Sequence, residues 1–174
     1  MRLLPLATAF VLSIGSAGAA HAQISRTSLI AVVENHKKAA LRYIDVAPDS
    51  MLTFRPVTGV RTYAEQLEHA TVSNAYIAHI AITGNEKVPA FGDTAVYLHN
   101  KAALRKVAIA AMDHTIAMLQ GASDASMAQE ITQFGVKMPR YRALMELLDH
   151  FPWTLGQVVP YLRLNGVVDR KSVV

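Results

Sequence analysis

The chain has 174 residues, no cysteine and a formal net charge of +4. This length favours one domain. The missing thiols exclude disulfides, Cys-ligated zinc and a cysteine nucleophile. The basic residues form no run and no nucleic-acid-binding motif is present, so we expect no nucleic-acid partner. A charge of this size mainly aids solubility.

The N-terminus has the layout of a secretory signal peptide. Arg2 supplies a positive start, residues 3–14 form an apolar run, and Ala20-His21-Ala22 is a small-residue cleavage site. The run is too short for a stable membrane span, and no second one follows. We therefore expect cleavage after Ala22 and a mature protein that is periplasmic or secreted, with no membrane association. The alternative is a buried N-terminal helix.

The first helix of the mature chain is expected over residues 25–46. Leu29, Val33 and Ala40 recur there at three- and four-residue spacing or its multiples, which places them on one helix face. Pro48 follows and predicts the end of this helix.

The second helix is expected over residues 62–83. Thr62 and Glu65 have the spacing of a capping box, in which each side chain satisfies a free backbone N–H of the other residue. Gly84 predicts the C-terminal stop. A loop is expected from there to residue 99.

The third helix is expected over residues 100–120, with Asn100 as its N-cap and Gly121 as its stop. A polar connection follows. Residues 130–136 within it are rich enough in β-branched side chains to predict a short extended piece.

The last helical region is expected over residues 140–164. Pro152 lies inside it and removes one backbone hydrogen bond, which predicts a kink or break near residues 149–151. Four amphipathic helices of this length predict an all-α four-helix bundle. We expect this domain over residues 23–168 and a mobile tail over residues 169–174.

Six histidines remain after cleavage and are the main resource for chemistry. They are His36, His69, His79, His99, His114 and His150. A lone histidine in a helix is most often structural, so its position in the helix must decide whether a functional role is expected. His79 shares a face with Glu65 and Glu68 and is expected to be solvated, whereas His36 lies on the apolar seam of the first helix.

Two of these histidines flank core faces. His69 does so in the second helix. In the last helix, His150, Thr154, Gln157 and Tyr161 form one polar strip. If the two helices are neighbours, the two imidazoles meet at a seam and can bind a divalent metal.

The same residues carry a family resemblance. FRPVTGVRTYAEQLEHATVSN (residues 54–74) and LMELLDHFPWTLGQVVPYLRLNGVV (residues 144–168) resemble the DinB-like family of bacterial four-helix-bundle proteins. In that family a loop similar to F-x-P precedes a helix with R-[ST]-x-x-E-x-x-x-H. The last helix is similar to H-x-x-x-H-x-G-Q, followed by Y-L-R.

The resemblance implies a divalent metal, commonly zinc or nickel, held by three histidines. Two of these positions correspond to His69 and His150. The third corresponds to Thr154, whose neutral hydroxyl is a poor metal ligand, so the implied metal is weakly held or absent. His36 is the first candidate for a replacement ligand because it is expected to face the interior. The resemblance also implies a homodimer.

Family members with all three histidines include thiol-dependent transferases and isomerases. The small thiols that they use are mainly cytoplasmic. An exported chain with an incomplete triad fits that chemistry poorly. One hypothesis is a non-catalytic module with a degenerate metal site that binds a small ligand or a partner. The alternative is a metal-dependent hydrolase or transferase that uses His69, His150 and a replacement third ligand. The sequence leaves open whether the protein is an enzyme and which ligand it binds.

Overall fold

The structure is a computed structural model that describes residues 25–167. The predicted signal peptide, its cleavage site after Ala22 and the tail at residues 169–174 lie outside the described residues.

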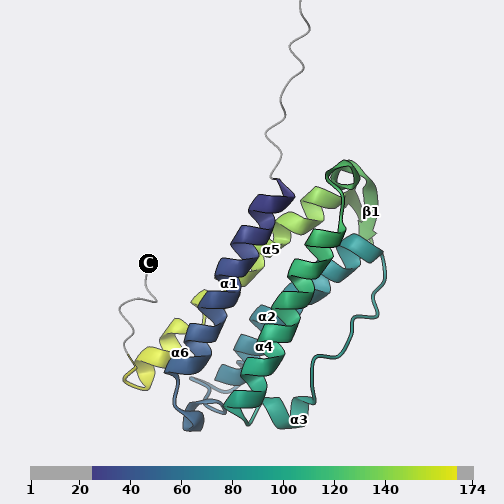
Figure 1. Cartoon of the computed structure of the whole chain (residues 1–174). Helices are drawn as coiled ribbons and strands as arrows, with labels where there is room; N and C mark the ends of the chain where they lie inside the picture. Colours follow the sequence, from purple (N-terminus) through teal and green to yellow (C-terminus); the bar gives the residue numbers. More distant parts are fainter. Residues whose placement is uncertain (1–24, 168–174) are drawn as a thin grey trace, which may run out of the picture.

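Four long helices pack as a bundle (Figure 1), which confirms the predicted fold class. They are α1 (Arg26–Val46), α2 (Tyr63–Thr83), α4 (Lys101–Gly121) and α5 (Arg140–Gly156). Helix α2 packs against both α4 and α5, and α1 packs chiefly against α4. The central position of α2 places its side chains at two different seams.

The first three long helices begin at side-chain caps. The side-chain oxygens of Ser25, Thr62 and Asn100 accept hydrogen bonds from backbone N–H groups of the first helical turn. Thr62 and Glu65 form the complete predicted capping box. These bonds satisfy donors that a helix start would otherwise leave free.

The core lies between the four helices and is built from side chains at helical spacing. Its largest fully buried members include Leu29, Tyr63, Leu67, Leu104, Met112, Leu119, Leu144 and Phe151. Each such side chain contributes about 1.5–3 kcal/mol through burial. Because α2 is covered on two sides, it also buries polar side chains such as Gln66, Thr71 and Asn74.

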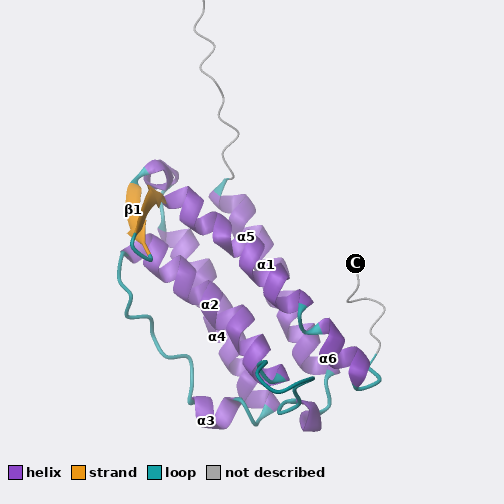
Figure 2. Cartoon of the chain, turned by 180° about the vertical axis from the view of Figure 1, so that it is seen from behind, coloured by secondary structure: helices purple, strands orange, loops and turns teal. Residues whose placement is uncertain are grey.

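The connection between α2 and α4 runs along the outside of the bundle (Figure 2). Gly84 ends α2 at φ 69°, a left-handed conformation that glycine adopts without a Cβ penalty. Residues 85–93, called the strap below, lead to the short helix α3 (Thr94–Tyr97), which Asp93 caps. The sequence predicted only a loop here.

The extended piece expected over residues 130–136 is one strand of a hairpin. β1 (Glu130–Gln133) pairs antiparallel with β2 (Val136–Pro139). The two turn residues, Phe134 and Gly135, both have positive φ angles, of 51° and 77°. Such turns match the twist of paired strands. Phenylalanine at the first turn position gives no turn signal, so the sequence showed only half of the hairpin.

Two short 3₁₀ segments complete the fold, at Asp49–Met51 and Asp124–Ala128. Among the described residues, none of the helices is both long enough and apolar enough to cross a membrane.

The last helical region is interrupted a few residues beyond Pro152. α5 continues through Pro152 to Gly156, and α6 (Val159–Leu164) starts after Val158 with Pro160 in its first turn. The buried neighbours Phe151, Thr154 and Leu155 hold the helix on either side of the exposed Pro152. Core packing therefore offsets the hydrogen bond that proline removes.

Candidate functional site

Helices α2 and α5 bring two histidines into contact at their seam. The Nε2 atoms of His69 and His150 lie 3.5 Å apart. Their ring centroids are 5.1 Å apart and the rings meet edge to face. We call the space around this pair the α2–α5 cleft. The two histidines that flank core faces in the sequence therefore meet in the structure.

The other ring nitrogen of each histidine is anchored by a neighbour on α2. His69 Nδ1 lies 2.9 Å from Ser73 Oγ, and His150 Nδ1 lies 3.1 Å from Asn74 Oδ1. An amide oxygen only accepts, so in this arrangement His150 Nδ1 donates and its Nε2 presents a lone pair. Asn74 and Ser73 fix the ring orientations, and the two Nε2 atoms lie on the same side of the seam, 3.5 Å apart.

Thr154 lies beside the pair, at the position where the resemblance implies a third metal ligand; we call this position the third corner. Its Oγ1 lies 3.5 Å from His150 Nε2, and the residue is 3% exposed. Gln66 donates one hydrogen bond to the Thr154 carbonyl at 3.2 Å and another to Gln157 Oε1 at 3.1 Å. This links the polar strip of α5 to α2 and holds the Thr154 backbone in place.

Both histidines of the cleft are neutral at neutral pH. Burial, followed by the nearby charges of His69 and Arg61, lowers the pKa of His150 from 6.5 to about 4. Burial and the Arg61 charge also lower the pKa of His69. Neutral imidazole is the form that coordinates metals and accepts hydrogen bonds.

Arg61 lines two surface hollows, and neither of them is lined by His69, His150 or Thr154. The larger has a volume of about 740 Å³ and also includes Gln66, Gln157 and Tyr161. The smaller, of about 510 Å³, includes Glu65, Glu68 and Tyr97 among its lining residues. Tyr161 Oη donates to the Arg61 carbonyl at 2.8 Å. Within residues 25–167, the Arg61 guanidinium forms no ion pair with a carboxylate.

The cleft fits a three-histidine metal site only in part. Two nitrogens bound at 2.0–2.1 Å to one tetrahedral zinc ion lie about 3.3–3.4 Å apart, close to the 3.5 Å between His69 and His150. The third position holds the neutral hydroxyl of Thr154. Among residues 25–167, no three His, Asp or Glu side chains are placed to share one ion.

His36, the expected replacement ligand, stacks on Phe151 of α5. The two ring centroids are 4.3 Å apart and the rings are inclined by 13°. His36 Nδ1 is buried and has no hydrogen-bond partner. Burial lowers the pKa of His36 from 6.5 to about 4. Its use as a third ligand stays a prediction, and it requires this stacked ring to move.

The prediction that His79 is solvated was wrong. His79 of α2 is half-buried, and its Nδ1 lies 3.0 Å from Nε2 of His114 on α4. The rings stack with centroids 5.2 Å apart. The helix face was assigned from spacing within α2 alone, whereas the contact is made with a side chain of α4. His99, by contrast, is exposed.

The fold and the site define a four-helix-bundle protein with a histidine-bearing cleft between its second long helix and its last. The model of the DinB superfamily matches residues 32–157. The chain therefore belongs to the DinB superfamily. A search among proteins with curated descriptions found no similar one.

Solved structures share this fold. A DinB-like protein from Bacillus subtilis is similar with a TM-score of 0.68 and 16% identity, over 81% of this chain and 94% of that one. A DinB-like protein from Bacillus cereus gives 0.65 and 18%, over 82% and 93%. A mycothiol-dependent maleylpyruvate isomerase gives 0.54 and 14%, over 78% of this chain and 60% of that one. Identities this low show the fold alone.

Proposed function

We propose that this DinB-superfamily protein is an exported, non-catalytic binding module that takes a small ligand in the α2–α5 cleft. The observation that carries the proposal is Thr154 at the third corner of the His69–His150 pair. The signal peptide predicted from the sequence supports export to the periplasm or beyond.

Thr154 argues against metal catalysis for a chemical reason. An open catalytic zinc site usually has three protein ligands and one water. The metal must be held firmly to lower the pKa of that water and create a nucleophile. Here two imidazoles and a neutral hydroxyl are the groups in place. Zinc or nickel would therefore be held weakly and lost readily.

The groups around the cleft favour an anionic small molecule. Arg61 lines both hollows and forms no ion pair within 4 Å among the described residues, although its charge adds to the capping hydrogen bonds that lower the pKa of the nearby Glu65. Its positive charge acts on both cleft histidines. Gln157 and Tyr161 add neutral polar groups to the larger hollow. A carboxylate held by Arg61, with its apolar remainder against Val57 and Pro160, uses these features together.

Ligand binding is tested on the mature chain from Gln23 by thermal shift and calorimetry, with benzoate and succinate compared with their neutral amides. The proposal expects binding of an acid and its loss in R61Q. R55Q is the matched control, because Arg55 is already 3.7 Å from Glu65. The absence of binding for every acid and amide, combined with tightly retained metal, would contradict the proposal.

The second candidate function is a metal-dependent hydrolase or transferase. The 3.5 Å spacing of the two Nε2 atoms and the anchored Nδ1 atoms favour it. It requires a third ligand such as His36. Stoichiometric zinc or nickel that is lost in both H69A and H36A would support this function over the first.

Partner binding and a homodimer are further parts of the proposal. Trp153 on α5 is 77% exposed, a large apolar surface for a single side chain. A second copy or another protein would cover it. Sedimentation of the mature chain at micromolar concentration checks the dimer, which requires twice the monomer mass.

A further inference from the structure

The smaller of the two hollows contains opposite charges that do not pair. Arg61, which precedes the N-cap of α2, and Glu68 of α2 both line this hollow of about 510 Å³. Neither side chain forms an ion pair within 4 Å among the described residues. Burial raises the pKa of Glu68, while the Arg61 charge acts in the opposite direction. The two groups are therefore close enough to interact but too far apart to bond directly.

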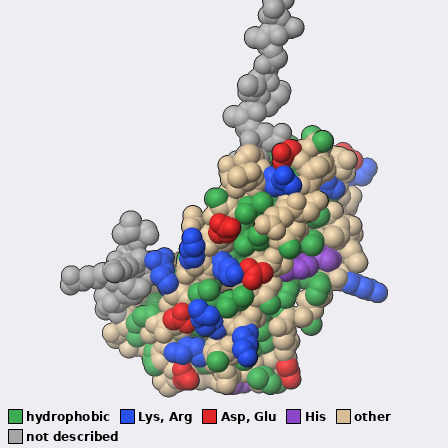
Figure 3. Space-filling model, in the orientation of Figure 1, with side chains coloured by type: hydrophobic (Ala, Val, Ile, Leu, Met, Phe, Trp, Pro, Cys, Tyr) green, Lys and Arg blue, Asp and Glu red, His purple; other side chains and the backbone are tan. Residues whose placement is uncertain are grey.

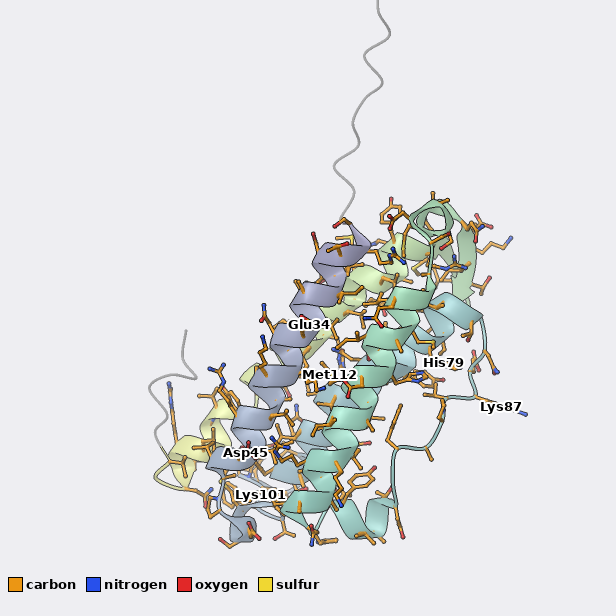
Figure 4. The ribbon with its side chains drawn as sticks, viewed as in Figure 1. Glu34, Asp45, His79, Lys87, Lys101 and Met112 are labelled. Carbon is orange, nitrogen blue, oxygen red and sulfur yellow. The ribbon has the colours of Figure 1, made fainter. Side chains whose placement is uncertain are left out.

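Charged side chains elsewhere on the bundle do pair. Figure 3 shows acidic and basic side chains beside one another over the face of α1 and α4, and Figure 4 labels Asp45 and Lys101, which belong to two of the pairs. The pairs on this face include Lys37–Asp113 at 2.5 Å, Arg105–Asp45 at 3.1 Å and Lys101–Asp49 at 3.3 Å. The unpaired charges in the hollow contrast with this arrangement.

Glu68 has only one weak partner inside the protein. It is half-buried next to α3, the short helix that follows the strap. Tyr97 Oη of α3 donates to Glu68 Oε1 at 3.4 Å, which is long for a hydrogen bond of this kind. A carboxylate offers about four acceptor positions, so most of those on Glu68 stay free. Partial burial without a cation penalises the charged form, and this is the cause of the raised pKa.

The other two charges of the hollow engage each other. Glu65 Oε2 accepts a hydrogen bond from the Thr62 backbone N–H at 2.6 Å and lies 3.7 Å from Arg55 Nη2. These contacts leave one free positive group, Arg61, and one free negative group, Glu68. The hollow therefore presents both signs of charge to a ligand.

A ligand that carries both an ammonium and a carboxylate group satisfies both free charges. An acid alone leaves Glu68 without a cation, and an amine alone leaves Arg61 without an anion. A guanidinium forms two parallel hydrogen bonds to a carboxylate, and an ammonium group donates up to three. A volume of about 510 Å³ lies within the usual range of small-molecule sites.

We propose that the ligand is a free amino acid, with its carboxylate on Arg61, its ammonium group on Glu68 and its side chain along Val60, which lines both hollows. The inference rests on the proposed function, in which Arg61 holds a carboxylate. It narrows the ligand class from acids in general to amino acids and assigns the recognition of the amine to Glu68.

The test is calorimetry on the mature chain from Gln23 with L-leucine and L-phenylalanine, each compared with the acid that lacks its amino group, isocaproate and hydrocinnamate. At least one amino acid should bind about tenfold or more tightly than its matching acid, because a hydrogen-bonded charge pair is gained. E68Q should abolish this preference, and R61Q should weaken the binding of both compounds. E34Q is the matched control, because Glu34 is an exposed carboxylate on α1 outside the hollow (Figure 4).

The outcomes separate this inference from the proposed function. If each acid binds as tightly as its amino acid and R61Q abolishes binding, the inference fails and the proposed function stands. If none of these compounds binds but benzoate does, the result is the same. Failure of every acid and amino acid to bind contradicts both.

Two further results would overturn the inference. One is an amino-acid preference that is unchanged in E68Q. The other is a favourable coupling between Arg61 and Glu68 in the unfolding free energies of ligand-free R61Q, E68Q and the double variant, because the two side chains would then pair with each other. If E68Q does not fold, the comparison of acids and amino acids on the wild type still decides.

Discussion

At the scale of single residues, Thr154 decides how the cleft is interpreted. Its position beside His150 follows from helical spacing, and the resemblance to the DinB-like family marks it as the position of the missing third histidine. The anchoring of His150 by Asn74 could not be predicted from the sequence, because that contact joins α5 to the buried side of α2. Sequence spacing describes one helix at a time, and the partners of a side chain come from the packing of two.

Restoring the third histidine should restore metal binding. We expect T154H to bind zinc or nickel at least about tenfold more tightly than the wild type, because a first ligand is worth no less than an outer partner. Calorimetric titration of the mature chain measures this. T154S is the control, because it keeps a neutral hydroxyl and should bind no better than the wild type. Equal affinities in T154H and the wild type would show that the corner is not a ligand position.

Acid should destabilise the protein through its buried histidines. The pKa values of His36 and His150 fall from 6.5 to about 4 on folding. Between these values the unfolded chain binds more protons than the folded chain. The stability that the neutral rings provide is therefore fully present above pH 6.5 and is lost as the pH falls toward 4.

The matching measurement is urea unfolding at several pH values. H36F keeps an aromatic ring against Phe151 but cannot titrate, so it should flatten the fall in unfolding free energy between pH 6.5 and 4. H99Q, which alters an exposed histidine, should keep the wild-type slope. A slope in H36F as steep as that of the wild type would refute this assignment.

At the scale of elements, start and stop signals located the long helices well. Thr62, Asn100 and Gly84 occupy the predicted cap positions because capping is a local interaction that the sequence encodes directly. The hairpin and the end of α5 were harder to predict from the sequence. The turn at Phe134 has no turn residue at its first position, and α5 passes Pro152 because of tertiary packing.

The capping box of α2 should contribute measurably to stability. T62A removes the oxygen that accepts from the Glu65 N–H and should lower the unfolding free energy by about 1 kcal/mol. Chemical denaturation provides the measurement. T58A, at an exposed position in the preceding loop, is the control and should stay within about 0.5 kcal/mol of the wild type. No difference between the two variants would argue against the cap.

At the scale of the whole molecule, α2 organises the bundle because it lies against both α4 and α5. This position explains why one helix supplies a histidine to each of two seams. Sequence periodicity predicted the number of helices and their core faces. It could not predict that α2 is enclosed on two sides, and for this reason it assigned His79 to solvent.

A cavity in the face of α2 should therefore weaken the whole fold. L67A removes a fully buried side chain and should lower the unfolding free energy by about 2–5 kcal/mol. L164A, at a residue that is 65% exposed, should change it by less than about 0.5 kcal/mol. Comparable losses in the two variants would mean that the core does not centre on α2.

The most direct test of the central claim is the metal content of the mature, untagged protein after equilibration with trace zinc and nickel, measured by plasma mass spectrometry for the wild type and H69A. A binding module with Thr154 in the triad should retain far less than one zinc or nickel ion per chain at the cleft, and H69A should not differ from the wild type. About one ion per chain that disappears in H69A would contradict this account and identify a working metal centre.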